Sequence, residues 1–267
     1  MEFKSIFSII LSALMTLFSP TSQVAEEVFL PEAENDSLFV VMDENYVTPM
    51  FTYSYPASKE GTEEFAEALK AKTTTEEIAA DNISDWSLRL DAPYLEECGF
   101  KIYLYNNATN ETYMSRDGNP YPIYDAYLMY GDDLYPFSQH YNDDPFNPIS
   151  GVGSCGLGGL AAADLNGDGI KELYFSGAWS TGYGILTGNP TELWCFDPVS
   201  SDKFVDIYQG FYNGPKFMIP VTDENGNLKI YNGWGDFVDG KFTVTVYSEY
   251  GEVVYENGEY QLKPYNE

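Results

Sequence analysis

Basic residues are scarce in this sequence. Its 267 residues include 13 lysines and arginines against 42 aspartates and glutamates, which gives a formal net charge of −29. A surface this acidic repels the phosphates of nucleic acids and the headgroups of anionic lipids. We therefore expect no nucleic-acid partner, and no membrane partner once a signal segment has been removed. The same charge suits a medium that contains calcium, because divalent cations relieve the repulsion between carboxylates.

Cysteine and histidine are also rare. The three cysteines, Cys98, Cys155 and Cys195, are an odd number, and none belongs to a CxxC pair. This count does not indicate a disulfide framework, although Cys155 and Cys195 can pair if their strands are neighbours. His140 is the single histidine. A zinc site built from cysteine and histidine is therefore not expected.

The signatures of several common enzyme classes are missing. The sequence holds no GxSxG, HExxH or P-loop motif, and its GxGxxG match at 151–156 leads into more glycines rather than a helix. We therefore discount a dinucleotide site. A carboxylate pair of the glycosidase kind stays open because acidic residues are abundant, but no pair stands out. An exported hydrolase that acts on polysaccharide is the alternative function left by this observation.

Long apolar runs are limited to one segment near the N-terminus. Ser5–Phe18 is apolar and uncharged, and it follows the basic residue Lys4. This length is short for a membrane span and is typical of the apolar part of an export signal. Small residues lead up to Ala25, so we predict a signal peptide over residues 1–25. The protein is then secreted, with or without attachment to the cell surface; an uncleaved membrane anchor is the alternative.

Aromatic residues, in contrast, are abundant. They make up 16% of the chain, and tyrosine alone occurs 23 times. Together with many Gly, Asn and Thr residues, this composition favours strands joined by tight turns. We predict a mainly β fold (α+β overall) with two short helices in its N-terminal part. The helices are expected at Lys59–Lys72, with Thr62 as the N-cap, and at Thr73–Ala80.

Strand-forming runs separated by turn residues continue along the chain. The predicted strands are Leu38–Met42, Phe100–Tyr105, Glu111–Ser115, Tyr124–Tyr130, Leu160–Ala163, Glu172–Phe175, Glu192–Phe196 and Phe204–Tyr208. Glu111–Ser115 is expected to return along Phe100–Tyr105 after a turn at 106–110. Gly131–Ser154 is rich in Asp, Asn, Pro and Gly and is predicted to be a long loop or a boundary. Three further hairpins are predicted at Asn225-Gly226, Asp239-Gly240 and Asn257-Gly258.

One short segment carries a metal-binding pattern. In Asp164-x-Asn166-x-Asp168-Gly169-x-x-Glu172, oxygen-bearing side chains occupy loop positions 1, 3, 5 and 9. Calcium (Ca2+) prefers six to eight hard oxygen ligands, whereas magnesium demands a tighter octahedron. Gly169 permits the sharp reversal that such a loop needs. The predicted ligands are the side chains of Asp164, Asn166, Asp168 and Glu172 and the backbone carbonyl of Ile170.

The run from Ala163 to Leu173, ADLNGDGIKEL, resembles the FG-GAP/VCBS calcium loop. An EF-hand would need a glutamate at position 12, which is Phe175, and flanking helices. In the FG-GAP/VCBS family the loop joins two strands of a propeller blade or blade-like module in integrin-like and bacterial surface proteins. The resemblance implies a hairpin-rich, propeller-blade-like β-module, here with a single loop copy. The similar stretch 223–227 lacks an acidic residue at position 9 and is predicted to be a plain turn.

These features predict a two-part organisation and a binding function. We expect an N-terminal α+β region over residues 26–150 and a calcium-binding β-module over residues 151–267. The calcium is expected to be structural, and the protein is expected to bind a protein or glycan at the cell surface rather than to catalyse a reaction. Aromatic residues in the second half either form a recognition surface or fill the core. They are Trp179, Trp194, Trp234, Tyr183 and Tyr212.

Overall fold

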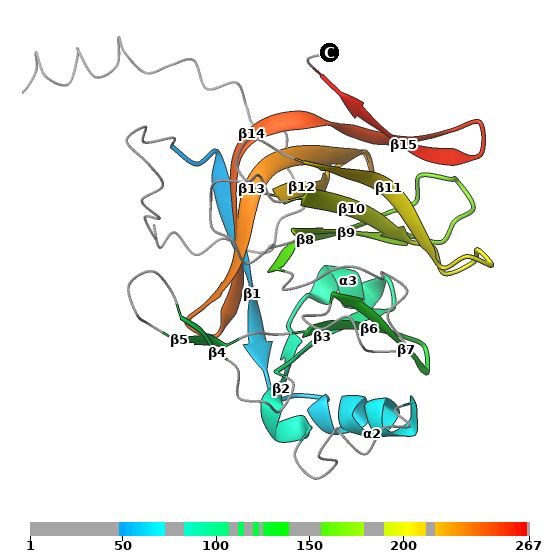
Figure 1. The fold of residues 1–267 in the computed structure, drawn as a ribbon. Helices are drawn as coiled ribbons and strands as arrows, with labels where there is room; N and C mark the ends of the chain where they lie inside the picture. The colour runs from blue at the N-terminus through cyan, green and yellow to red at the C-terminus, as the bar shows by residue number, and fades with distance from the viewer. Residues whose placement is uncertain are drawn as a thin grey trace, which may run out of the picture.

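The computed structural model describes residues 48–72, 83–106, 112–114, 120–122, 125–138, 156–178, 190–211 and 217–265. This part of the chain is mainly β, with two large antiparallel sheets, a small two-stranded sheet and two short α-helices (Figure 1). The predicted mainly β fold with two short helices is therefore confirmed. The described strands do not close into a propeller or a barrel.

The larger sheet contains nine strands. They are β1 (Phe51–Ser58), β2 (Ser87–Leu90), β3 (Phe100–Tyr105), β6 (Asp125–Tyr130), β7 (Asp133–Ser138), β12 (Phe217–Thr222), β13 (Leu228–Val238), β14 (Lys241–Glu256) and β15 (Glu259–Pro264). Their order is β12-β13-β14-β1-β2-β3-β6-β7. β15 pairs with Gly251–Glu256 of β14, beyond the residues of β14 that pair with β1. Because β1 pairs with β14, strands from both predicted regions, 26–150 and 151–267, share this sheet.

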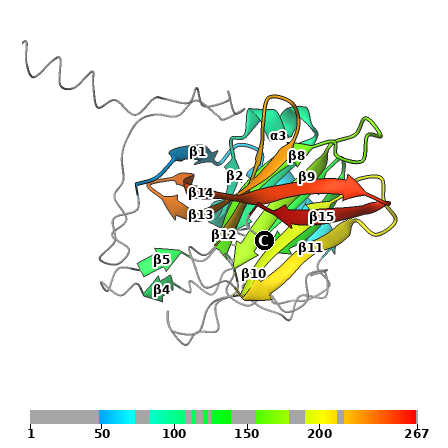
Figure 2. The same ribbon diagram turned by 90° about the horizontal axis from the view of Figure 1, so that it is seen from above.

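The second large sheet is a simple meander of four strands. It consists of β8 (Gly156–Ala163), β9 (Glu172–Ala178), β10 (Pro190–Phe196) and β11 (Phe204–Phe211), in the order β11-β10-β9-β8. Figure 1 shows that the nine-stranded sheet bends around it, with β12, β13 and β14 on one side and β3, β6 and β7 on the other. Figure 2 shows from above that β15 crosses over the four-stranded sheet.

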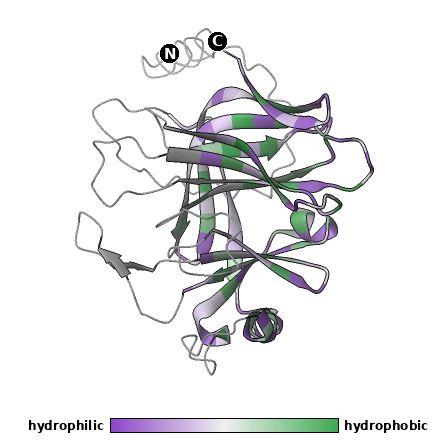
Figure 3. Ribbon diagram, turned by 45° about the vertical axis from the view of Figure 1, so that its right-hand side comes forward, coloured by the Kyte–Doolittle hydropathy of each residue, from purple (hydrophilic) through white to green (hydrophobic). Residues whose placement is uncertain are grey.

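Alternation along the strands explains why these layers stack. In β3, Ile102 and Leu104 face the four-stranded sheet, whereas Tyr103 and Tyr105 face the helix α2 (Thr62–Lys72). Phe65 of α2 stacks on the ring of Tyr103, with 4.9 Å between ring centroids. Since successive side chains of a strand point to opposite faces, the consecutive buried residues 102–105 of β3 serve two cores. Figure 3 shows hydrophobic and polar residues alternating along the strands.

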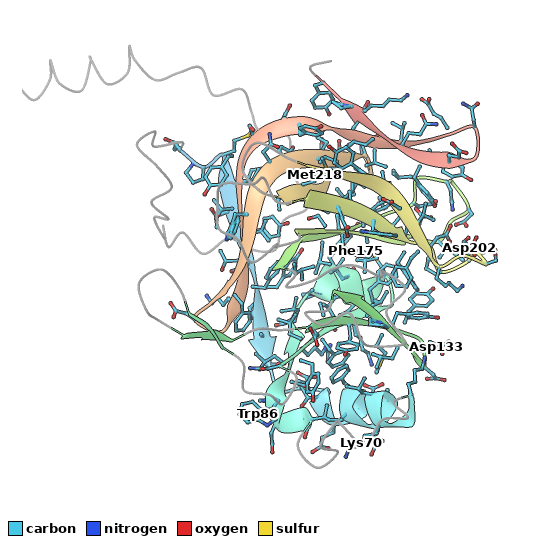
Figure 4. All side chains as sticks on the ribbon, viewed as in Figure 1. Lys70, Trp86, Asp133, Phe175, Asp202 and Met218 are labelled. Carbon is cyan, nitrogen blue, oxygen red and sulfur yellow. The ribbon has the colours of Figure 1, made fainter. Side chains whose placement is uncertain are left out.

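The four-stranded sheet is also covered on both faces. Phe175 of β9 belongs to the core shared with β3 and β6, and its neighbour Tyr174 belongs to the core shared with β12, β13 and β15. Phe175 and Met218, labelled in Figure 4, therefore lie in cores on opposite sides of this sheet. Burial on both faces makes this sheet the centre of the described fold and a rigid support for its loops.

The predicted hairpins at Asn225-Gly226, Asp239-Gly240 and Asn257-Gly258 are all confirmed. They connect β12 to β13, β13 to β14 and β14 to β15. Asp239 and Asn257 have φ values of 50° and 54°, and Gly240 and Gly258 have φ values of 77° and 88°. Positive φ at both central residues is the geometry of the type I′ turn that such pairs favour.

Most predicted strands are found, but two predictions for the middle of the chain are wrong. β4 (Thr112–Met114) lies within the predicted strand Glu111–Ser115, yet it pairs with β5 (Pro120–Pro122), whereas β3 pairs with β6. The predicted loop Gly131–Ser154 contains β7, because residues 131 and 132 form a tight turn that sends the chain back along β6. Gly131 and its neighbour thus form a hairpin turn at the start of the predicted loop, and residues 139–154 lie outside the described residues.

The helical predictions are met in part. The predicted helix Lys59–Lys72 appears as α2; Thr62 is its first residue, and the Thr62 hydroxyl donates a hydrogen bond to the carbonyl of Lys59 (2.9 Å). The other described α-helix, α3 (Pro93–Glu97), and the 3₁₀ turn at Ser84–Trp86 were not predicted. The predicted helix Thr73–Ala80, the predicted strand Leu38–Met42 and the predicted signal at 1–25 lie outside the described residues. Among the described helices, none has the length and apolarity to cross a membrane.

The two large sheets come closest where β13 passes β8. A methyl group added at Gly235 of β13 would overlap the carbonyl oxygens of Leu157 and Gly158 in β8. We expect Gly235→Ala to lower the free energy of unfolding by about 2 kcal/mol, because backbone atoms cannot move aside as a side chain can. Gly131→Ala is the control: it adds a methyl group in open space, at a φ of 60°, and should cost about 1 kcal/mol. Urea unfolding midpoints of the two variants would measure the difference, and equal midpoints would contradict this account.

Candidate metal centre

The predicted calcium loop is the connection between two neighbouring strands. Ala163, the last residue of β8, pairs with Glu172, the first residue of β9. The eight residues 164–171 therefore close a hairpin at one end of the four-stranded sheet. Strands flank the loop on both sides, which agrees with the expectation that it is not an EF-hand.

Backbone amides hold the loop in its folded shape. Asp164 accepts hydrogen bonds from the amide of Gly167 (2.8 Å) and the amide of Gly169 (2.9 Å). Asp168 accepts a hydrogen bond from the amide of Ile170 (2.8 Å). Gly167 and Gly169 have φ values of 76° and 87°, a region that residues with a β-carbon rarely adopt. The two glycines thus allow the chain to reverse around its own carboxylates.

Three of the five predicted ligands converge in space. Carboxylate oxygens of Asp164, Asp168 and Glu172 lie within 4.8 Å of one another. Since calcium–oxygen bonds are 2.3–2.6 Å long, two oxygens bound to one calcium ion are separated by at most about 5 Å. The three carboxylates can therefore hold a metal ion between them.

The other two predicted ligands sit beside this cluster. The Oδ1 atom of Asn166 accepts a hydrogen bond from the amide of Asp168 (2.9 Å), and its Nδ2 donates to Oδ2 of Asp168 (3.3 Å). The hydrocarbon side chain of Ile170 has no atom that can bind a metal, so this residue can offer the site only its backbone carbonyl. Coordination by the Asn166 amide oxygen and the Ile170 carbonyl stays a prediction.

Glu172 is the buried member of the cluster, with 1% of its surface exposed. Its Oε2 accepts hydrogen bonds from the amide of Leu165 (3.1 Å) and the hydroxyl of Tyr174 (2.9 Å). Burial raises the pKa of Glu172 to about 7, and the charges of Asp197 and Asp164 add to the rise, against the opposing effect of these two hydrogen bonds.

Among the described residues, no cationic side chain pairs with the cluster. Within the part of the chain that the structure describes, no lysine or arginine forms an ion pair with Asp164, Asp168 or Glu172. Lys171 points instead to α3, where its Nζ lies 3.1 Å from the Tyr94 hydroxyl. The negative charge of the cluster is therefore relieved either by a proton or by a bound cation.

Sequence reasoning missed three residues that complete the surroundings of the cluster. Tyr174 binds Glu172 directly; Asp197 follows β10; and Tyr260 lies on β15, where its hydroxyl contacts both Asn166 and Asp197. The end of the predicted strand Glu192–Phe196 gave a weak signal for Asp197. No sequence signal pointed to Tyr260, which lies 94 positions from Asn166.

Five aromatic residues were expected either to form a recognition surface or to fill the core, and the two that are described pack against the core. Trp194 and Trp234 are half-buried and pack against the main core. Trp179, Tyr183 and Tyr212 lie outside the described residues, as do His140 and Cys155. Cys98 and Cys195 carry free thiols.

The stretch 223–227 forms a hairpin turn, as predicted. The Asp223 carboxylate accepts hydrogen bonds from the amides of Asn225 and Asn227 and from the Asn227 side chain, each at 2.9 Å. These bonds all serve to close the turn between β12 and β13.

The fold and the site define a class: a β-rich protein of two packed antiparallel sheets, with an acidic hairpin loop able to hold a metal ion. No protein-family model, no curated protein and no solved structure matches the chain.

Proposed function

We propose that this chain is a secreted or cell-surface protein whose β8–β9 loop binds one structural calcium ion. We further propose that it serves as an interaction module for a protein or glycan partner. The observation that carries the metal site is the convergence of Asp164, Asp168 and Glu172, one of them buried, with no ion pair to a lysine or arginine of the described residues. A divalent cation would balance this charge and would release the proton that Glu172 otherwise retains near neutral pH.

The chemistry of the ligands favours calcium over other metals. The cluster consists of carboxylates, without a cysteine or histidine among its members. Oxygen-only sites suit calcium, magnesium and manganese, whereas zinc and copper prefer nitrogen and sulfur. A hairpin loop with oxygen-bearing side chains at alternate positions fits the larger and less regular coordination shell of calcium. The likeness of residues 163–173 to the FG-GAP/VCBS loop supports the same choice, and the meander β8–β11 would then correspond to a single blade-like unit.

We propose that the ion acts on stability rather than on chemistry. It would hold together the loop that joins β8 to β9 at one end of the four-stranded sheet. The binding role rests on the resemblance to surface proteins and on the acidic charge, which disfavours nucleic acid and anionic membranes. Loss of partner binding on removal of calcium would support this role.

Calorimetric titration of calcium chloride into the metal-free protein at pH 7.5 tests the proposal. We expect one site with a dissociation constant on the order of 10⁻⁴ to 10⁻³ M, as in extracellular calcium modules, and weaker binding of magnesium. Absence of heat at millimolar calcium would overturn the calcium site. Binding of labelled protein to glycan arrays and to glycosidase-treated cells, each with and without chelator, would separate a glycan partner from a protein partner.

A further inference from the structure

We infer that Tyr260 and Asp197 are positioning residues of this metal site, which orient the Asn166 side chain toward the ion. The inference rests on the proposed calcium site and adds residues from outside the loop motif. Figure 1 shows the setting: the β8–β9 loop, the β10–β11 loop and the β14–β15 hairpin gather at one end of the described structure. The Tyr260 hydroxyl connects all three.

The Tyr260 hydroxyl links the β8–β9 loop to the β10–β11 loop through two hydrogen bonds. The Nδ2 of Asn166 donates to the Tyr260 hydroxyl (3.3 Å), and this hydroxyl donates to Oδ2 of Asp197 (3.3 Å). The order of donors is set by chemistry: the Asn166 amide nitrogen can only donate, so the phenol oxygen accepts from it and its own hydrogen is free to point to Asp197. The phenol is therefore the acceptor for Asn166 and the donor for Asp197.

This chain of bonds decides which end of the Asn166 amide faces the loop. An asparagine ligates calcium through its oxygen, and a rotated amide would present its NH₂ group to the cation instead. Nδ2 donates both to the Tyr260 hydroxyl (3.3 Å) and to Oδ2 of Asp168 (3.3 Å), while Oδ1 accepts a hydrogen bond from the Asp168 amide (2.9 Å), so Tyr260 and the Asp168 backbone hold opposite ends of the Asn166 amide. Groups that bond to the far side of a metal ligand commonly fix its orientation in this way.

Asp197 is itself held firmly, so it can serve as an anchor. It is 8% exposed, and its Oδ1 accepts hydrogen bonds from the amides of Val199 (2.9 Å) and Ser200 (3.0 Å). The Asp197 amide donates to the carbonyl of Lys203 (2.8 Å). With Oδ1 engaged by the turn, Oδ2 is the oxygen that meets Tyr260.

The Tyr260 ring is fixed by its neighbours. It meets the ring of Tyr174 edge to face, with 6.0 Å between centroids, and the ring of Tyr255 at 4.8 Å. Tyr255 and Tyr260 are cross-strand partners in the β14–β15 hairpin. Packing against these two rings thus holds the Tyr260 hydroxyl beside the β8–β9 loop. The hydroxyl acts through Asn166 without contacting the ion.

Calcium titrations of Tyr260→Phe, with Tyr255→Phe as the matched control, test this inference. Both variants remove one hydroxyl from the same hairpin, but only Tyr260 bonds to Asn166. We expect Tyr260→Phe to weaken calcium binding by about 10- to 100-fold, the range for residues that orient metal ligands, and Tyr255→Phe to bind as the parent does. The two variants should have the same melting temperature in the presence of a chelator. Equal values would show that Tyr260→Phe does not act by unfolding the site.

The hydration of bound terbium distinguishes a positioning role from a purely structural one, because loss of stability alone would not change it. Luminescence lifetimes of directly excited terbium in H₂O and D₂O report the number of water molecules on the bound ion. In Tyr260→Phe we expect about one additional bound water, because the amide oxygen of Asn166 is no longer held in place. In the Asn166→Ala background, Tyr260→Phe should have no further effect on affinity, since the two residues act as a unit.

The outcomes separate this inference from the calcium site itself. If the parent protein does not bind calcium, the proposed function fails and the positioning role fails with it. If the parent binds calcium and Tyr260→Phe binds with equal affinity and equal terbium hydration, the positioning role alone is overturned. Weaker binding with unchanged hydration would also overturn it, because Tyr260 would then act on the stability of the hairpin and not on Asn166.

Discussion

Asp168→Ala is expected to abolish the rise in melting temperature that calcium produces in the parent protein. For a dissociation constant of about 10⁻⁴ to 10⁻³ M, 10 mM calcium stabilises the folded state by about 1.4 to 2.7 kcal/mol. For a chain of this size that corresponds to a rise of roughly 3 to 10 °C. Asp168 supplies one of the three clustered carboxylates and accepts a hydrogen bond from the Ile170 amide. Its removal therefore takes away a predicted calcium ligand and also a hydrogen bond that holds the loop.

The matched control for this experiment is Asp202→Ala. Asp202 is an exposed carboxylate on the neighbouring β10–β11 loop, labelled in Figure 4, and it does not belong to the cluster. Its removal changes the net charge by the same amount, so a general effect of charge would affect both variants. We expect the control to keep the full calcium response. A variant at Asp168 that responds to calcium as the parent does would place the ion elsewhere.

Glu172→Gln is expected to stabilise the metal-free protein above pH 7 and to remove its response to calcium. In the folded chain, burial raises the pKa of Glu172 to about 7 from a usual value of 4.5. The folded state then binds a proton more tightly than the unfolded state. Stability from this group is therefore fully present below pH 4.5 and is lost as the pH rises through 7. The loss is on the order of 3 kcal/mol, and glutamine avoids it because it never ionises.

Unfolding in chelator and in 10 mM calcium, measured from pH 5 to pH 8.5, would check this. In chelator, the parent should lose stability from pH 5 to pH 8, whereas Glu172→Gln should lose less. In calcium, the parent should regain that stability at pH 8, because the ion replaces the proton. Glu224→Gln, at an exposed position in the β12–β13 turn, should follow the parent in both series. Identical pH profiles for Glu172→Gln and the parent in chelator would contradict the assigned role of the buried carboxylate.

The features that could be predicted are those encoded within a few residues. The pairs Asp239-Gly240 and Asn257-Gly258 adopt positive φ values that few other residue types tolerate, so the turn and its flanking strands follow from the pair itself. The carboxylates of Asp164, Asp168 and Glu172 are separated by four positions each, and a hairpin loop brings them together without help from the rest of the fold. Local chemistry was sufficient for these elements.

The features that could not be predicted depend on distant parts of the chain. Thr112–Met114 was expected beside Phe100–Tyr105, but that place is taken by β6, whose apolar residues match both faces of β3. β1 was not predicted, although Phe51–Tyr55 alternates aromatic with smaller polar residues as a strand does, and only Pro56 argues against a strand. Tyr260 reaches the metal loop only because β15 folds back over the four-stranded sheet.

The pairing of β1 with β14 has a consequence for how the chain reaches its folded state. Phe51 lies opposite Val246, so one of the two neighbours of β1 is supplied almost at the end of the polypeptide. The entropy of closing so long a loop opposes early formation of this contact, and folds dominated by such contacts form slowly. A nascent chain that lacks residues 241–246 leaves an edge of β1 unpaired, which keeps the large sheet open during synthesis.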